Sequence, residues 1–145
     1  MQDNVNCIAM HHFKLILISD EQFSEKEIPL IQWAFKNGLD RFHLRKQNAS
    51  QEEINKLLSY FSAEELTKIT IHYHHQLPYT VLPIIGLHYS LDYLRKSCSQ
   101  EEILTMENIG ISLSFSLHQW DEIQLIPATC DYVFMSPIYP SINKP

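Results

Sequence analysis

The chain has 145 residues, of which 45% are hydrophobic and 11% aromatic, so it can bury a sizeable core in one domain and is too apolar for a disordered protein. The formal net charge of −6 excludes a broad basic surface for nucleic acid, and an anionic ligand would need a local basic pocket. The 3 cysteines form no CxxC pair, which argues against a disulfide framework or a zinc ribbon. No apolar run approaches the roughly 18 residues of a membrane span, and the polar start is unlike a signal peptide. We therefore expect a cytoplasmic protein with no nucleic-acid or membrane partner.

The pattern of apolar residues predicts strands that alternate with helices. In the first half we expect a strand over 14–19, a helix over 25–37, a strand over 41–45, a helix over 50–61, a helical turn at 62–65 and a strand over 68–72. In the second half we expect a strand over 84–89, a short helix over 99–106, a strand over 109–114, a helix over 116–126 and a strand over 131–136. Patterns of the form S-x-x-E predict capping boxes that begin at Ser50, Ser62 and Ser99.

This alternation indicates parallel β-α-β units, an α/β fold. Two architectures fit the pattern equally well, a (β/α)₈ barrel and a doubly wound open sheet. The chain contains neither GxGxxG nor GxxxxGK[ST], so the glycine-rich phosphate loops that are common on doubly wound sheets are absent from the sequence.

Six segments, in order, resemble the thiamine phosphate synthase/TenI family. Residues 17–20 are similar to its L-I-T-D, 42–47 to Q-L-R-E-K, 71–75 to I-N-D-R, 85–88 to G-V-H-L, 109–112 to G-x-S, and 131–144 to D-Y-V-G-x-G-P-I-F-P-T-x-T-K. The resemblance implies a TIM-type (β/α)₈ barrel with its functional groups at the carboxyl ends of the strands. It implies a single domain over 1–145 with about six strand-helix units, lacking the last two.

The resemblance also implies a role in thiamine biosynthesis, with a phosphorylated thiazole or pyrimidine as the ligand. The synthase of this family joins a pyrimidine pyrophosphate to a thiazole phosphate and expels pyrophosphate, so cations and polar donors around the phosphates supply most of the catalysis. The matching positions give these expected phosphate-binding residues: Arg45, Gln47, His72, Ser112, Ser141, Asn143 and Lys144. The alternatives to phosphate binding are that Arg45 is an ordinary exposed arginine at a strand end and that Ser141, Asn143 and Lys144 belong to an ordinary polar turn.

The metal site of the family is altered in this sequence. The family binds Mg²⁺ through two aspartates, and Tyr73 and Tyr93 stand at those positions, with Asp92 one residue away from the second. A neutral phenol is a poor magnesium ligand, so we expect the site to be lost or rebuilt. His72 and His74 share one face of an extended segment and suggest a different metal, but the sequence dictates no third ligand.

Two functions remain open from the sequence. The first is an enzyme of the thiamine pathway, either a synthase-type transferase or a TenI-type thiazole tautomerase. The tautomerase uses a histidine shortly after the G-x-S strand, whereas His118 is expected here inside the following helix. The second is a non-catalytic ligand-binding or regulatory relative without the metal. His88 is expected to be a hydrogen-bonded core histidine.

Self-association is expected for a chain that supplies about six strands. Residues 15–18 and 132–135 then form apolar edge strands with unpaired backbone groups, which favour pairing with another chain. An incomplete gene product whose parent was active is a further alternative.

Overall fold

The computed structural model describes residues 13–22, 24–72, 86–96, 101, 108 and 110–139. In chain order, the elements are β1 (Ile16–Ile18), α1 (Glu27–Lys36), β2 (Arg41–Leu44), α2 (Gln51–Leu58), α3 (Ala63–Leu66), β3 (Ile69–His72), β4 (Gly86–Ser90), α4 (Leu91–Lys96), β5 (Ser112–Leu117), the 3₁₀ helix η1 (Trp120–Leu125) and β6 (Cys130–Met135).

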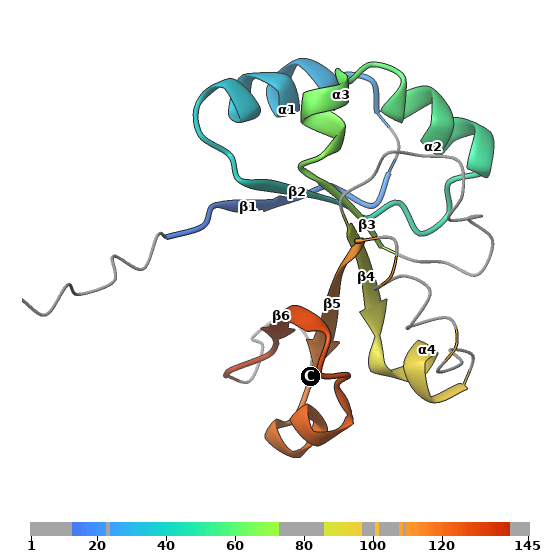
Figure 1. Ribbon diagram of the computed structural model, residues 1–145. Helices are drawn as coiled ribbons and strands as arrows, with labels where there is room; N and C mark the ends of the chain where they lie inside the picture. Colours follow the sequence, from blue (N-terminus) through green and yellow to red (C-terminus); the bar gives the residue numbers. More distant parts are fainter. Residues whose placement is uncertain are drawn as a thin grey trace, which may run out of the picture.

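The six strands form one parallel sheet in the order β1-β2-β3-β4-β5-β6. The sheet curls like an open half-barrel, and α1, α2 and α3 cover one face of its first strands (Figure 1). A doubly wound sheet would reverse its strand order at a switch point. Because every strand here lies beside its predecessor, the observed sheet is that of a barrel-type fold, although the described residues show six strands and no closed barrel.

The two faces of the sheet differ in chemistry because successive side chains of a strand point to opposite sides. The side facing the helices is apolar and contains Phe42, Leu44, Ile69, Ile71, Leu87, Tyr89, Leu113 and Phe115, which pack with helix residues such as Ile31 and Leu57. The alternate positions carry Arg41, His43, Thr70, His72, His88, Ser112, Ser114 and Ser116. Bulky branched side chains dominate the inside of a typical barrel, so this polar concave face is unusual.

Two predicted capping boxes are confirmed. Ser50 and Glu53 satisfy each other's backbone N–H groups at the start of α2, and Ser62 and Glu65 do so at the start of α3. The third, at Ser99, lies outside the described residues.

The second half of the chain corrects two expectations and adds one helix. The fifth strand is β5 at Ser112–Leu117 rather than 109–114, and the helix expected over 116–126 is replaced by the end of β5 and by η1. The serines of β5 face the polar concave side, so this strand alternates between polar and apolar residues. Helix α4 follows β4 directly and was not predicted, while most of the helix expected over 99–106 lies outside the described residues.

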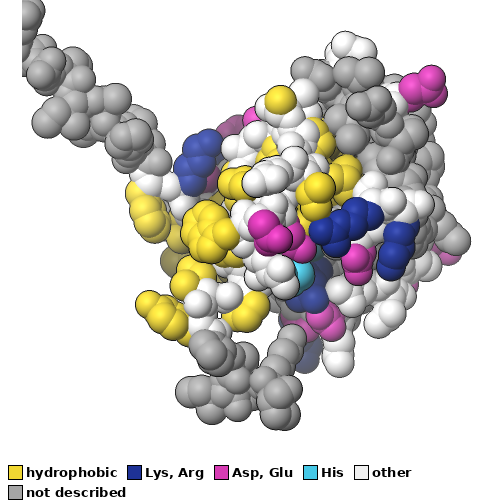
Figure 2. All heavy atoms as spheres, turned by 90° about the horizontal axis from the view of Figure 1, so that it is seen from below, with side chains coloured by type: hydrophobic (Ala, Val, Ile, Leu, Met, Phe, Trp, Pro, Cys, Tyr) yellow, Lys and Arg dark blue, Asp and Glu magenta, His cyan; other side chains and the backbone are white. Residues whose placement is uncertain are grey.

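Hydrophobic side chains remain exposed near both edges of the sheet. Figure 2 shows such side chains gathered on one part of the surface, beside an area where Lys, Arg, Asp and Glu are mixed. The most exposed ones near the two edges are Phe13 (89%), Leu15 (51%) and Ile18 (45%) at β1, and Ile138 (75%) and Tyr139 (81%) after β6. No described helix is long and apolar enough to span a membrane.

Candidate functional site

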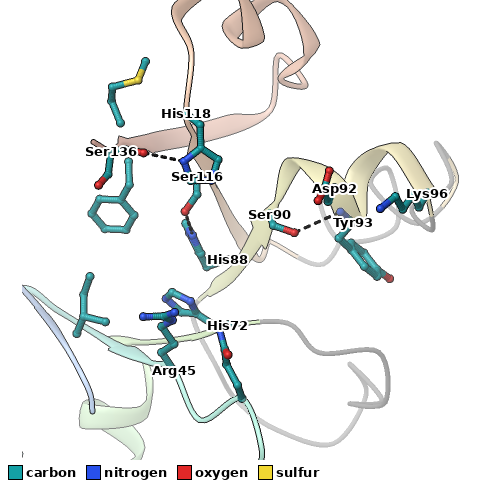
Figure 3. Close-up of a pocket in the computed structure, with 14 residues that line it drawn as sticks. Arg45, His72, His88, Ser90, Asp92, Tyr93, Lys96, Ser116, His118 and Ser136 are labelled. Carbon is teal, nitrogen blue, oxygen red and sulfur yellow. Dashed lines mark hydrogen bonds between the residues drawn. The ribbon is translucent and has the colours of Figure 1, made fainter. Parts of the chain in front are cut away.

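A cavity of about 740 Å³ lies at the carboxyl ends of the strands. Its walls contain Ile18, Arg45, Gln47, His72, His88, Ser90, Asp92, Tyr93, Lys96, Ser116, His118, Phe134, Met135 and Ser136. Figure 3 shows Arg45, His72 and His88 on the strand side of this cavity and Asp92, Tyr93 and Lys96 on α4. Polar groups from three strands, from the segments that follow β2, β5 and β6, and from one helix therefore converge on one space, as in the sites of parallel α/β proteins.

Among the described residues, two cationic side chains, Arg45 and Lys96, line the cavity, together with one carboxylate, Asp92. Arg45 Nη2 lies 2.8 Å from Glu21 Oε1, and the two side chains are 41% and 51% exposed. An exposed ion pair of this kind contributes only about 0.2–1 kcal/mol, so a multiply charged anion can replace Glu21. The cavity thus provides the local positive charge that an anionic ligand requires on an acidic protein.

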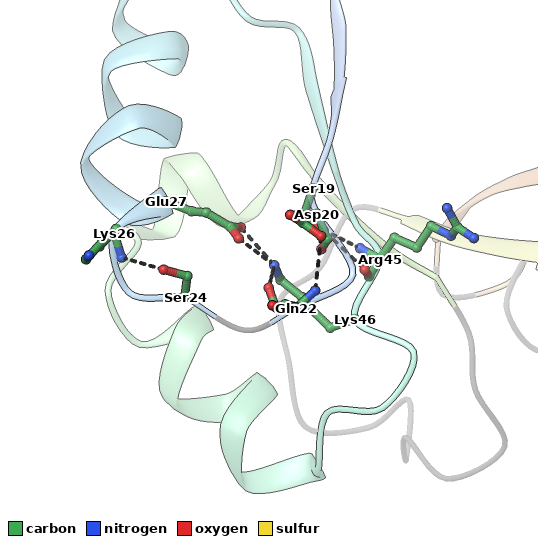
Figure 4. Close-up of polar contacts among 8 residues, drawn as sticks. All are labelled: Ser19, Asp20, Gln22, Ser24, Lys26, Glu27, Arg45 and Lys46. Atoms are coloured by element: carbon green, nitrogen blue, oxygen red, sulfur yellow. Dashed lines mark hydrogen bonds and ion pairs between the residues drawn. The ribbon is translucent and has the colours of Figure 1, made fainter. Parts of the chain in front are cut away.

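Lys46 takes no part in the cavity, although it follows Arg45 in the chain. Its Nζ lies 2.8 Å from Glu27 Oε1 and donates to the carbonyl oxygen of Gln22, and the side chain is buried. Figure 4 shows Arg45 and Lys46 pointing to opposite sides of the chain. Lys46 thus turns away from Arg45, and its charge holds the start of α1.

Three histidines from adjacent strands form a cluster inside the curl of the sheet. His43 Nδ1 lies 3.0 Å from His72 Nε2, and the rings of His72 and His88 are 4.3 Å apart. On its other side, His43 Nε2 lies 2.7 Å from the hydroxyl oxygen of Tyr132. His43 and His88 are buried, whereas His72 is half-buried and lines the cavity.

Burial keeps two of these imidazoles neutral. Desolvation, with smaller repulsion from His88 and Arg41, lowers the pKa of His43 to about 3. Desolvation, followed by repulsion from Arg45, lowers the pKa of His88 to about 4. Both side chains are therefore uncharged at pH 7.

His88 is hydrogen-bonded as predicted. Its Nδ1 lies 2.9 Å from Ser114 Oγ and its Nε2 lies 2.8 Å from Ser116 Oγ. Ser114 Oγ also donates to the carbonyl oxygen of Leu87 at 3.4 Å, so this hydroxyl accepts from His88. That arrangement places the proton of His88 on Nδ1 and leaves Nε2 as the acceptor for Ser116.

The structure brings together only some of the residues predicted for phosphate binding. Arg45, Gln47 and His72 line the cavity, as do Asp92 and Tyr93 of the family metal positions. Tyr73, His74, Ser141, Asn143 and Lys144 lie outside the described residues.

Ser112 lies at the opposite end of the sheet. The predicted strand ended two residues after Ser112, whereas β5 begins at this residue, so Ser112 lies at the amino end of the sheet. There its Oγ accepts a hydrogen bond from Arg41 Nη1 at 2.9 Å. The three-residue difference between the expected and observed strand starts therefore moves Ser112 away from the cavity.

Sequence reasoning missed Lys96, Ser90 and Ser116, and it considered His118 but placed it inside a helix. Lys96 was missed with its helix, although Ser90 before an apolar residue and the basic pair 95–96 are ordinary signals for the two ends of a helix. His118 was expected inside a helix, but it directly follows β5 and lines the cavity. Its Nδ1 lies 2.7 Å from the carbonyl oxygen of Ser136, so Nδ1 carries the proton and Nε2 is the acceptor.

Comparison with solved structures identifies a similar fold. The chain is similar to thiamine phosphate pyrophosphorylase from Bacteroides thetaiotaomicron, with a TM-score of 0.69 and 28% sequence identity over 88% of this chain and 59% of that one. The chain thus has a thiamine phosphate pyrophosphorylase-like fold. It spans somewhat more than half the length of that structure. No family model matches the chain, and no curated protein matches it significantly.

The cavity does not fit the magnesium ion that the resemblance implies. Magnesium prefers carboxylate oxygens, and Asp92 is the single carboxylate in the described lining. Tyr93, at one family aspartate position, packs its ring against Tyr89 with a centroid distance of 5.1 Å and an interplanar angle of 16°. Its ring is used for packing at the edge of the core.

Proposed function

We propose that the cavity binds a phosphorylated thiazole or pyrimidine, in a role related to thiamine biosynthesis. The observation that carries this proposal is the convergence of Arg45 and Lys96, from two distant parts of the chain, on one cavity at the carboxyl ends of the strands. The similarity to thiamine phosphate pyrophosphorylase supports the ligand class.

The cavity offers both charged groups for a phosphate and an apolar surface for a heterocyclic ring. The guanidinium of Arg45 can present two parallel N–H groups to a phosphate, and Lys96 adds a second charge. Gln47 and Ser90 offer neutral donors beside them. The ring of Phe134 supplies an apolar surface for a heterocycle.

The proposed role is ligand binding without magnesium-dependent condensation of the two thiamine precursors. It rests on the single carboxylate among the described lining residues and on the packed ring of Tyr93. We expect no thiamine phosphate from the two precursors with or without Mg²⁺. Product that forms with Mg²⁺ and disappears on chelation would show that Asp92 and other groups rebuild the metal site.

A second candidate function is proton transfer on a bound thiazole, as in the TenI-type tautomerase. It is favoured by the position of His118, which follows β5, lines the cavity and has Nε2 as its acceptor nitrogen. Deuterium incorporation from D₂O into a thiazole phosphate, followed by NMR, tests it. Exchange that His118→Gln abolishes establishes proton transfer, and exchange no faster than in buffer limits the protein to binding.

Calorimetry tests the binding proposal. A thiazole phosphate should bind at least about tenfold more tightly than the unphosphorylated thiazole alcohol, since charge-assisted hydrogen bonds contribute about 1.5–3 kcal/mol. Arg45→Ala and Lys96→Ala should each remove most of this preference. Arg95→Ala is the matched control, because Arg95 lies on the same helix but outside the cavity lining. Equal affinity for both thiazoles would contradict the proposal.

A further inference from the structure

The cluster of His43, His72 and His88 has the composition of a metal site that the resemblance to thiamine enzymes does not include. One ring nitrogen of each histidine lies within 4.8 Å of a nitrogen of the other two. We propose that these three histidines bind one divalent transition-metal ion, Zn²⁺, with a fourth coordination position open to the cavity.

The strand register creates this geometry. His72 and His88 are paired directly across β3 and β4, and His43 is paired with Thr70, two residues before His72, across β2 and β3. All three side chains project from the concave face. In a tetrahedral site, nitrogens about 2.0–2.1 Å from zinc stand roughly 3.3 Å from each other. The separation of 3.0 Å between His43 Nδ1 and His72 Nε2 is close to this value. All three candidate nitrogens lie within 4.8 Å of one another, so the rings have to adjust for one ion to contact all three.

Outer hydrogen-bond partners are already in place for the two buried histidines. A metal-bound histidine ordinarily donates its other N–H group to an oxygen atom, which holds the ring in position. Tyr132 offers its hydroxyl oxygen to His43 Nε2 at 2.7 Å, and Ser114 offers its hydroxyl oxygen to His88 Nδ1 at 2.9 Å. His43 Nδ1 and His88 Nε2 are then the nitrogens directed at the ion. His88 exchanges its hydrogen bond with Ser116 for the metal bond.

The donor set selects the class of metal. Three neutral imidazoles suit Zn²⁺ and its neighbours in the first transition row, whereas Mg²⁺ requires oxygen ligands. His72 is half-buried at the cavity wall, so the cavity gives the ion a route of entry and gives water or a ligand access to the fourth position.

Titration with Co²⁺ tests this proposal, because a four-coordinate Co²⁺ ion has intense visible absorption and occupies zinc sites. The metal-free full chain should bind one equivalent of Co²⁺ with that spectrum, and added Zn²⁺ should displace it. The experiment uses no thiazole ligand, so its result is independent of the proposed phosphate-binding function. Absence of a four-coordinate spectrum together with no heat from Zn²⁺ in calorimetry overturns the proposal.

Substitutions locate the ion. His72→Gln should weaken Co²⁺ binding more than about tenfold, and Tyr132→Phe, which removes only an outer partner of His43, should weaken it about tenfold. His118→Gln is the matched control, since His118 lines the same cavity outside the cluster, and its Co²⁺ affinity should equal that of the unchanged chain. His72 is half-buried, so its replacement is tolerated better than that of His43, and circular dichroism verifies the fold. Binding that survives His72→Gln, or that His118→Gln abolishes, overturns the assignment.

Discussion

The guanidinium group of Arg41 lies against Gly86, so closely that a Cβ atom added to Gly86 would stand 3.1 Å from Arg41 Nη1. That nitrogen donates to Thr70 Oγ1 at 3.2 Å and to Ser112 Oγ at 2.9 Å, and the guanidinium carbon lies 5.2 Å from the ring centre of Tyr132. The missing side chain at residue 86 therefore makes room for an arginine on the concave face of the sheet.

Replacement of this glycine should destabilise the fold. In Gly86→Ala, the new Cβ would also lie 2.9 Å from Thr70 Oγ1 and 3.0 Å from the carbonyl oxygen of Ser112. We expect a loss of about 1–3 kcal/mol in the free energy of unfolding, measured by urea denaturation. Adding Thr70→Ala should recover part of the loss only, since the Ser112 carbonyl is backbone. A neutral effect of Gly86→Ala would mean that Arg41 does not occupy this position.

The ion pairs Lys46–Glu27 and Lys56–Glu25 should differ in strength. Lys46→Ala removes the buried partner of Glu27, whose side chain is 21% exposed, and should cost about 2–4 kcal/mol of stability. Lys56→Ala is the matched control: its pair with Glu25 is 2.6 Å long but both side chains are more than half exposed, so we expect a much smaller loss of stability. Similar losses in urea denaturation would contradict the burial of Lys46.

Acid should weaken the fold already between pH 6.5 and pH 5. The folded-state pKa values of His43 and His88 are lowered to about 3 and about 4, mainly by burial, and each histidine regains its ordinary value of 6.5 on unfolding. Below pH 6.5 the unfolded chain therefore binds more protons than the folded chain, so stability falls as the pH decreases. Each histidine should contribute about 1.5 kcal/mol over this interval.

Urea denaturation at a series of pH values, with a chelator present, measures this slope. His88→Gln should reduce it to about half, because one of the two buried histidines is removed. The pKa of Glu53, lowered by hydrogen bonds from Ser50, places its titration below the interval. A slope unchanged by His88→Gln would show that other groups cause the acid sensitivity.

Replacement of Glu21, whose carboxylate competes with an anionic ligand for Arg45, should strengthen anion binding in the cavity. Glu21→Gln leaves Arg45 without its partner at 2.8 Å, so a thiazole phosphate no longer has to displace that carboxylate. We expect two- to fivefold tighter binding by calorimetry, corresponding to about 0.4–1 kcal/mol for an exposed pair. Glu52→Gln, on the exposed surface of α2, should have no effect. Weaker binding in Glu21→Gln would place the phosphate away from Arg45.

Self-association through the strand edges remains a prediction. In the described sheet, β1 and β6 each have a strand neighbour on one side only, and Leu15 beside β1 is 51% exposed. Light scattering across a dilution series should show a mass above that of one chain, and Leu15→Lys should lower it. Trp33→Lys, which removes an exposed apolar side chain from α1, should not. A monomer at all concentrations would contradict the prediction.

The sequence by itself determined the local structure and the class of fold. The capping boxes at Ser50 and Ser62 and the alternation of strands and helices follow from residues close together in the chain, while the barrel-type order of the strands was expected only from the family resemblance. Arg45 was found through its match to the family motif at 42–47, and the structure places it directly after β2, in the cavity at the carboxyl end of the sheet.

Only the tertiary structure decided which side chains meet. The residue at which β5 starts decides whether Ser112 lies at the cavity or at the opposite end of the sheet. No local pattern specifies this starting residue, because a strand with alternating serines depends on the polar face that the other strands provide. The pairing of His72 with His88, and their approach to His43, follows from the register between β2, β3 and β4. Register and curvature arise from contacts between residues distant in sequence, and these contacts assemble the histidine cluster.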